Sequence, residues 1–161
     1  NGLMRGGFGL IYSAESISVR IARDMIPRSE FSDMNETQAI NTLALNYNSS
    51  KLSLGGEYNS RENTANIIDN TSSAFSFYGS LDLGDGFSLF GRYDQSSSEN
   101  ALEEQWNIEN EGELTIFGVE KKMTEGVKIS ANIRSYTDAT LESDTDLESI
   151  NTLFLNLEYK F

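Results

Sequence analysis

The sequence predicts an all-β chain that forms an antiparallel, up-and-down transmembrane β-barrel with about nine strands. Three features of the sequence lead to this fold class. Apolar residues recur at every second position over stretches of about ten residues, polar connections alternate between short and long, and aromatic residues gather at the ends of the apolar stripes. Strands of about ten residues suit a tilted membrane crossing, and the wall of a membrane barrel alternates between apolar and polar side chains.

The connections between strands set the organisation of the chain. Short polar connections occur at residues 14–16, 49–51, 84–86 and 124–126, and each interval between them holds a strand, a longer polar loop and a returning strand. Nine strands are therefore predicted, over residues 3–12, 17–26, 38–48, 52–61, 73–83, 87–95, 114–123, 127–137 and 152–161. Residues 1–161 are interpreted as a single β-barrel domain or as the C-terminal part of one.

The alternation within each strand predicts two different faces. In the last strand, Leu155 and Leu157 share one face, whereas Asn156 and Glu158 share the other. A soluble antiparallel sheet over a core also shows one-sided alternation, so a soluble β-sandwich with an aromatic core stays as the alternative. The sequence contains no amphipathic helix and no second set of strands that would cover the apolar face, which favours lipid as its environment.

Aromatic residues at the stripe ends support a membrane environment, because amphipathic aromatic side chains favour the two interfaces of a bilayer. One group lies near the short connections or the C-terminus and comprises Tyr12, Tyr47, Phe87, Tyr159 and Phe161. A second group lies toward the long loops and comprises Tyr58, Phe75 and Tyr93.

Composition excludes several classes of function. The 161 residues include 25 Asp and Glu against 12 Lys and Arg, giving a net charge of −13, and much of the acidic charge lies in the long loops. Such a chain repels nucleic-acid phosphates, so no nucleic-acid partner is expected. The sequence has neither Cys nor His, which removes thiol chemistry and the commonest general base and metal ligand. We therefore expect no enzyme activity, no cofactor and no metal site.

The last nine residues, Leu153-Phe-Leu-Asn-Leu-Glu-Tyr-Lys-Phe161, combine an apolar alternation with a terminal aromatic residue. This pattern resembles the C-terminal signature of Gram-negative outer-membrane β-barrels, and residues 90–94 and 126–134 are similar to segments of porin-like barrels. The resemblance implies a location in the bacterial outer membrane, short turns in the periplasm and acidic loops outside the cell. It also implies that Tyr159 and Phe161 act as an assembly signal for the barrel-assembly machinery, and that lipid and lipopolysaccharide surround the protein.

Strand number leaves two alternatives open. Bacterial outer-membrane barrels have an even number of strands, whereas nine strands are counted. Either the chain is the C-terminal portion of a larger barrel, or it is a complete eight-stranded barrel in which one strand has been counted too many. The first alternative is preferred because the opening segment, around Arg5, has no turn before it.

Charged residues on the polar face are the candidate functional residues. Each ascending strand places one arginine there, and carboxylates lie among them. The candidate pore-lining residues are Arg5, Arg20, Asp24, Glu57, Arg61, Asp82, Arg92, Asp94, Lys128, Arg134, Glu158 and Lys160. In a small barrel these charges would pair into a plug, and in a wide one they would line a wet channel and bias ion passage.

The function expected from these residues is a porin-like channel for passive diffusion of small hydrophilic solutes or ions, acting alone or as a homo-oligomer. The alternative is a small non-conducting outer-membrane barrel with a structural or adhesive role. The loop that carries Trp106 would either fold inward as a constriction or cap the barrel.

Overall fold

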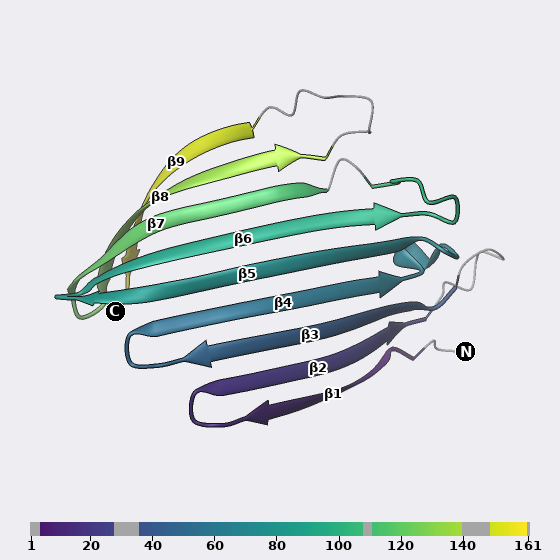
Figure 1. Ribbon diagram of the computed structural model, residues 1–161, viewed down its shortest axis with the longest axis horizontal. Coiled ribbons are helices and arrows are strands. Elements are labelled where there is room, and N and C mark those ends of the chain that lie inside the picture. The colour runs from purple at the N-terminus through teal and green to yellow at the C-terminus, as the bar shows by residue number, and fades with distance from the viewer. Residues whose placement is uncertain (1–3, 28–35, 108–110, 140–148, 161) are drawn as a thin grey trace.

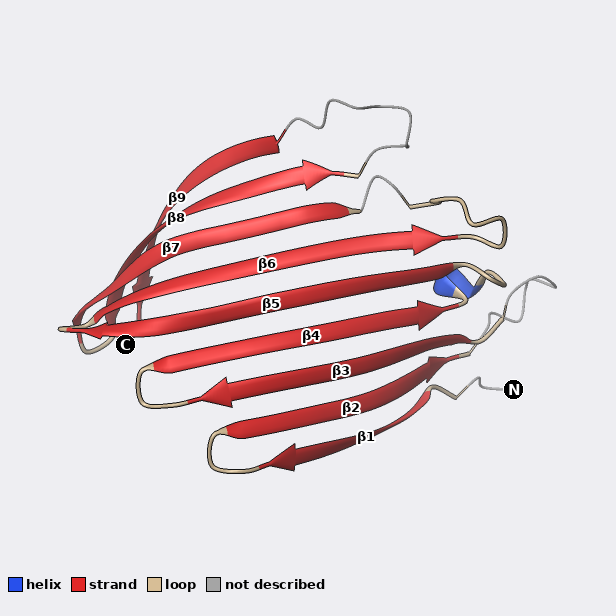
Figure 2. Cartoon of the chain, in the orientation of Figure 1, coloured by secondary structure: helices blue, strands red, loops and turns tan. Residues whose placement is uncertain are grey.

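The computed structural model describes residues 4–27, 36–107, 111–139 and 149–160, and they form one antiparallel sheet with the strand order β1-β2-β3-β4-β5-β6-β7-β8-β9. Each strand pairs with the next one along the chain (Figure 1, Figure 2). The strands are β1 (Gly6–Ser13), β2 (Ile17–Ile26), β3 (Gln38–Asn48), β4 (Leu52–Glu62), β5 (Thr71–Gly84), β6 (Phe87–Glu99), β7 (Gly112–Thr124), β8 (Val127–Asp138) and β9 (Ser149–Tyr159). A single-turn 3₁₀ helix, η1 (Thr64–Asn66), precedes β5.

The number and order of strands confirm the predicted up-and-down architecture, and the alternative count of eight strands is wrong. Six strands are longer than the alternation of apolar residues predicts, notably β5 and β6 at their long-loop ends. There the ladder continues through polar pairs, with Ser72 opposite Ser98 and Ser73 opposite Ser97. β1 begins three residues later than predicted, at Gly6.

Short connections close the hairpins at one end of the sheet, as predicted. The β5–β6 turn needs left-handed backbone at three successive residues, with φ of 86° at Gly84, 51° at Asp85 and 77° at Gly86. Glycine adopts such angles without steric cost. The Asp82 carboxylate accepts the Gly84 backbone N–H at 2.7 Å, which stabilises the same turn.

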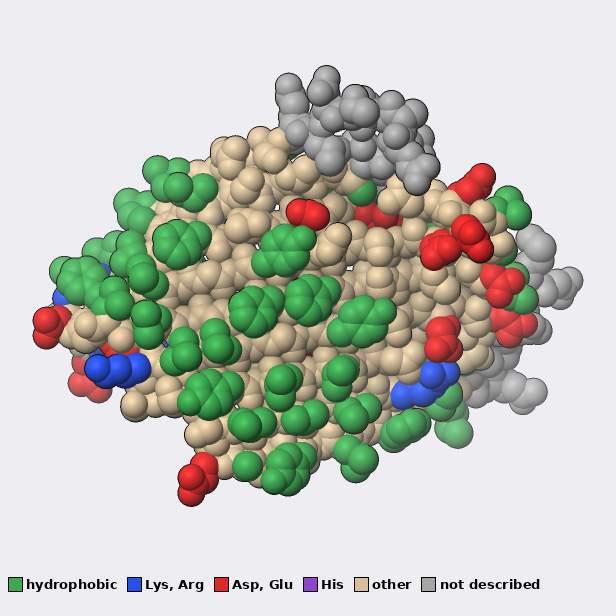
Figure 3. Space-filling view, in the orientation of Figure 1, with side chains coloured by type: hydrophobic (Ala, Val, Ile, Leu, Met, Phe, Trp, Pro, Cys, Tyr) green, Lys and Arg blue, Asp and Glu red, His purple; other side chains and the backbone are tan. Residues whose placement is uncertain are grey.

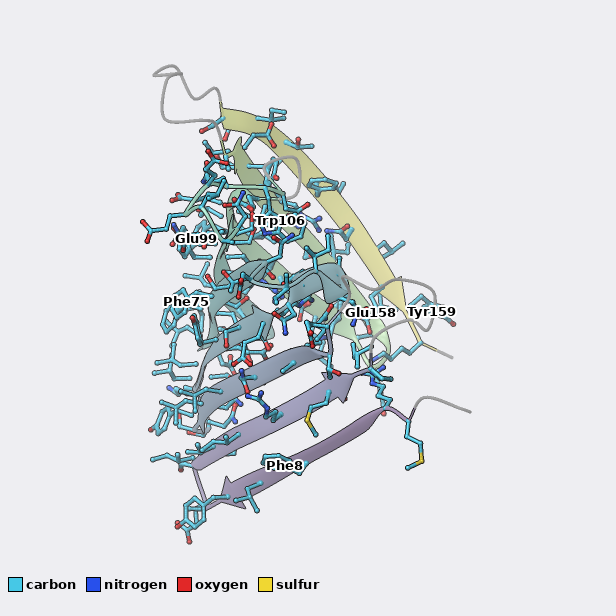
Figure 4. All side chains as sticks on the ribbon, turned by 90° about the vertical axis from the view of Figure 1, so that its right-hand side faces the viewer. Phe8, Phe75, Glu99, Trp106, Glu158 and Tyr159 are labelled. Atoms are coloured by element: carbon cyan, nitrogen blue, oxygen red, sulfur yellow. The ribbon has the colours of Figure 1, made fainter. Side chains whose placement is uncertain are left out.

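The sheet is open and strongly curved. Among the described residues β1 pairs only with β2, and β9 only with β8. The short-turn end of β9 passes behind the neighbouring strands in Figure 1, so the sheet has a convex and a concave face. In Figure 4, Phe75 on β5 and Tyr159 on β9 project from the convex side, whereas Glu158 lies on the concave side. No helix in the described segments is long and apolar enough to cross a membrane.

Large apolar side chains cover the convex face instead of forming an internal core (Figure 3). Within the described part of the chain only Ala39 and Ala44 are buried hydrophobic residues, while Leu155 is 79% exposed and Leu10 76% exposed. A second layer that would bury these side chains is absent from the described segments, so the soluble β-sandwich alternative does not fit. Along β5 the apolar band runs from Leu83 to Phe75, which corresponds to a height of roughly 20 Å for a typical strand tilt.

The aromatic residues predicted to form two interfacial rings lie on the convex face, except for Phe161, which lies outside the described residues. Tyr12, Tyr47 and Phe87 are exposed at the short-turn end, and Tyr58 and Phe75 are direct cross-strand partners at the other end of the band. Beyond Tyr58 and Phe75 the convex face becomes polar. The convex face therefore carries an apolar band with aromatic residues near both of its limits, and a polar end follows toward the long loops.

Candidate functional site: the charged concave face

The strand register places the candidate pore-lining residues on the concave face. One row of cross-strand partners runs from Arg20 through Ala44 to Glu57, and continues through Ser76 to Asp94. A second row joins Arg92, Ile116 and Arg134. The remaining candidates follow the same parity or adjoin it at the strand ends: Asp24, Arg61, Asp82, Lys128, Glu158, Arg5 and Lys160.

Two arginines, one beside the edge strand β1 and one on the interior strand β6, each contact both oxygens of a carboxylate. Arg5 lies just before β1, and its Nε lies 3.1 and 3.0 Å from the two carboxylate oxygens of Asp24. This hydrogen bonding raises the pKa of the Arg5 guanidinium above its ordinary value. On β6, the Nε of Arg92 lies 2.9 and 2.7 Å from the Asp94 oxygens, and Ser76 donates a further hydrogen bond to the same carboxylate.

Two lysines pair with glutamates near the short turns. Lys128 on β8 lies 3.0 Å from Glu120 on β7, and Lys160 lies 2.9 Å from Glu158. Glu120 was not among the sequence-derived candidates, because the alternation over residues 114–123 is less regular than in the other strands. Glu120 lies two residues before Lys122 on β7, so the two side chains share the concave face, and this spacing could have identified Glu120 as a candidate.

Three arginines on the concave face, Arg20, Arg61 and Arg134, form no ion pair within the described part of the chain, and all three are exposed. Arg134 instead lies over the ring of Phe154, 4.2 Å from its centroid, and its Nε donates to the Asn132 side chain at 3.3 Å. Glu57 accepts a hydrogen bond from Asn59 at 2.6 Å. The face thus combines neutralised local pairs with solvent-exposed guanidinium groups.

No protein-family model matches the sequence, and no curated protein matches it. Among solved structures, the chain is similar to OmpT (in-vitro folded), an outer membrane protein of Vibrio cholerae, with a TM-score of 0.60 and 14% identity. The chain has the fold of an outer membrane β-barrel protein. The match covers 95% of this chain and 63% of that protein, so the chain spans less than two thirds of its length.

A polar collar lies on the convex face, between the apolar band and the long loops. We define it by Arg23, Asn41, Ser60 and Glu62. Arg23 lies 3.1 Å from Glu62 and donates to Asn41 at 2.8 Å, and the Asn41 amide donates to Glu62 at 3.2 Å. This cluster was not predicted from the sequence, although Arg23 has the parity of the apolar residues Val19 and Ile21.

The described part of the β6–β7 loop stays at the ends of β5 and β6. The indole N–H of Trp106 donates to the Thr71 carbonyl at 3.0 Å, and the backbone N–H groups of Trp106 and Asn107 donate to the Ser98 hydroxyl at 3.3 and 3.0 Å. A hollow of about 980 Å³ adjoins this loop and is lined by serines and by glutamates that include Glu99, Glu103 and Glu104. These contacts hold the described part of the loop against the long-loop ends of β5 and β6.

Two further sequence predictions concern the C-terminus and metals. Tyr159 lies on the convex face opposite Val127, whereas Phe161, the other half of the predicted assembly signal, lies outside the described residues. Among the described residues no group of three or more carboxylates, cysteines or histidines is close enough to hold a metal ion.

Proposed function

We propose that the chain forms the wall of a porin-like channel in the outer membrane, through which small hydrophilic solutes or ions diffuse passively. The observation that carries the proposal is the division of one curved sheet into an apolar convex face and a charged concave face (Figure 3, Figure 4). Lipid is the environment in which the exposed leucine, isoleucine and phenylalanine side chains are stable. Water is the environment that suits the exposed guanidinium groups of Arg20, Arg61 and Arg134.

The chemistry of the concave face supports passage without catalysis. Its charged groups are paired side by side, as in Arg92–Asp94 and Lys128–Glu120, or face solvent. Neither His nor Cys occurs in the sequence to serve as a general base or nucleophile. The proposed role of the charges is to create a field across a wet channel, which biases ion passage.

The proposed environment is the outer membrane of a Gram-negative bacterium. The convex face would contact lipid, and the polar collar around Arg23 and Glu62 would lie at the level of lipopolysaccharide head groups. We further propose that the C-terminal residues, including Tyr159, engage the barrel-assembly machinery, that no nucleic acid binds, and that a homo-oligomer is compatible with the exposed convex surface.

Planar-bilayer recording on the full-length protein tests the proposal. Detergent-extracted protein should show a heat-modifiable shift on gels, and it should conduct in KCl with ohmic steps. Folded protein that inserts but passes no current would contradict the channel and point instead to the non-conducting barrel. Protein that is freely soluble without detergent would contradict the membrane assignment itself.

A further inference from the structure

The concave face is not polar throughout. An apolar stripe, which we define as Phe90, Leu114, Ile116, Ile150 and Phe154, lies in two parts, one on β6 and β7 and the other on β9, with polar side chains of β8 between them. Every member has the same parity as the charged candidates. Phe90 lies opposite Gly118, so its ring rests on bare backbone: a Cβ at Gly118 would lie 2.5 Å from the ring. Ile150 is 60% exposed. Leu114 and Ile116 are half-buried, so in a solvated channel wall these apolar side chains are partly in contact with water.

Two arginines frame this stripe. Arg92, Ile116 and Arg134 are successive partners in one cross-strand row, which places the two arginines on either side of the isoleucine, about 10 Å apart along the sheet. Asp94 occupies the Nε edge of Arg92, whose side chain is still 50% exposed. Arg134 has no ion pair in the described segments, and its guanidinium makes a cation–π contact with the ring of Phe154. The stripe therefore adjoins at least one exposed cation that is held in place.

We propose that the apolar stripe, together with Arg134 and Arg92, binds small organic anions that carry an apolar or aromatic body, with benzoate as the simplest probe. This inference rests on the proposed function, because it takes the concave face to be the channel wall. The carboxylate would pair with the guanidinium of Arg134, whose planar fork matches carboxylate geometry. The ring would lie on Ile116 and Phe90.

The apolar body of the anion contributes more binding free energy than its charge does. An ion pair at a solvated surface contributes little by itself, so acetate or chloride gains little from Arg134. A phenyl ring that loses about half of its water contact on the stripe gains enough to bind roughly tenfold more tightly than acetate. The acidic loops repel benzoate, acetate and chloride alike, so the difference between benzoate and acetate rests on the contact with the stripe.

The experiment uses the full-length protein in planar bilayers, with KCl as the conducting salt and sodium benzoate, sodium acetate or benzyl alcohol added. Benzoate should reduce the KCl current, or cause resolvable closures, at concentrations about tenfold below those needed for acetate. Benzyl alcohol, which has the ring but no charge, should act more weakly than benzoate. Equal effects of benzoate and acetate would overturn the role of the stripe, and equal effects of benzoate and benzyl alcohol would overturn the role of the arginines.

Variants locate the site. In Ile116→Ser and Phe154→Ser, the benzoate concentration that reduces the KCl current should rise close to that of acetate. In Arg134→Gln, the effect of benzoate on the current should fall close to that of benzyl alcohol. Ile40→Ser is the matched control, because Ile40 is an apolar concave residue on β3, outside the stripe. If Ile40→Ser weakened the effect of benzoate as much as Ile116→Ser does, the apolar stripe would not be the binding site. The wild-type comparison of the three probes needs no variant to fold. Failure of the proposed function is a separate outcome, since it abolishes the KCl current itself.

Discussion

The ring of Tyr78 on β5 lies over Gly55, its direct partner on β4, and its hydroxyl donates to the Asn46 side chain on β3 at 2.9 Å. One side chain thus joins three strands on the concave face. The arrangement depends on the missing side chain at residue 55, because a Cβ there would overlap the tyrosine ring. Phe90 and Gly118 form the equivalent pair between β6 and β7.

Gly55→Ala should destabilise the folded sheet by about 1–3 kcal/mol, because the new methyl group displaces Tyr78 from its hydrogen bond. The free energy of unfolding is measured from the urea dependence of the heat-modifiable gel shift. Gly56→Ala is the control: its Cβ would point to the convex face, 3.8 Å from the nearest atom. Equal destabilisation by the two substitutions would show that the ring contact is not the cause.

Arg92→Glu combined with Arg134→Glu should shift ion preference toward cations if the concave face lines a channel. Reversing two charges on the wall changes the local potential by an amount on the order of kT, which should move the reversal potential by roughly 10–25 mV in 0.1 M salt. The shift should shrink in 1 M salt, where the Debye length falls to about 3 Å. Arg23→Glu, on the convex face, should leave the reversal potential unchanged. No shift in the double variant would remove these arginines from the channel wall.

Leu155→Arg should destabilise the membrane-inserted protein by about 2–4 kcal/mol, the cost of an arginine on the lipid face near the bilayer midplane. Leu155 is 79% exposed on the convex face of β9. Asn156→Arg, one residue later and on the concave face, should cost much less because the new charge meets water. The free energy of unfolding of both variants is measured in lipid vesicles. Similar values for the two positions would mean that hydrocarbon does not cover the convex face.

Replacing Tyr159 and Phe161 together by alanine should lower the amount of folded protein in the outer membrane several-fold, while refolding of the purified chain into detergent stays nearly unchanged. The distinction follows because an assembly signal acts on recognition in the cell rather than on the stability of the finished sheet. Lys160→Ala serves as the control. A matching loss of refolding in detergent would assign the two aromatic residues a structural role instead.

The sequence predicted the strands well because a period of two is a direct consequence of a sheet with one apolar and one polar face. The four short turns fixed the hairpins, and nearly all predicted limits lie within three residues of the observed ones. The Ser-rich ends of β5 and β6 escaped prediction, since Ser72, Ser73, Ser97 and Ser98 show no apolar alternation although their backbones continue the ladder.

Parity predicted that the candidate charges share one face of the sheet, as the register has them, but it does not determine which charges meet. The Lys128–Glu120 pair depends on the register between β7 and β8, which shifts at the bulge between Lys122 and Thr124. The apolar stripe around Ile116 was overlooked for a related reason. Its members lie on different strands, and only the pairing brings them and the two arginines into one surface.

The limited height of the apolar band also bears on where this sheet is stable. A band of roughly 20 Å is shorter than the hydrocarbon layer of most bilayers, and the bacterial outer membrane is thinner than average. Bilayers of long acyl chains would have to compress around the sheet or draw the polar collar at Arg23 and Glu62 below the head groups. Hydrophobic mismatch would therefore make insertion fastest, and the inserted sheet most stable, in thin membranes.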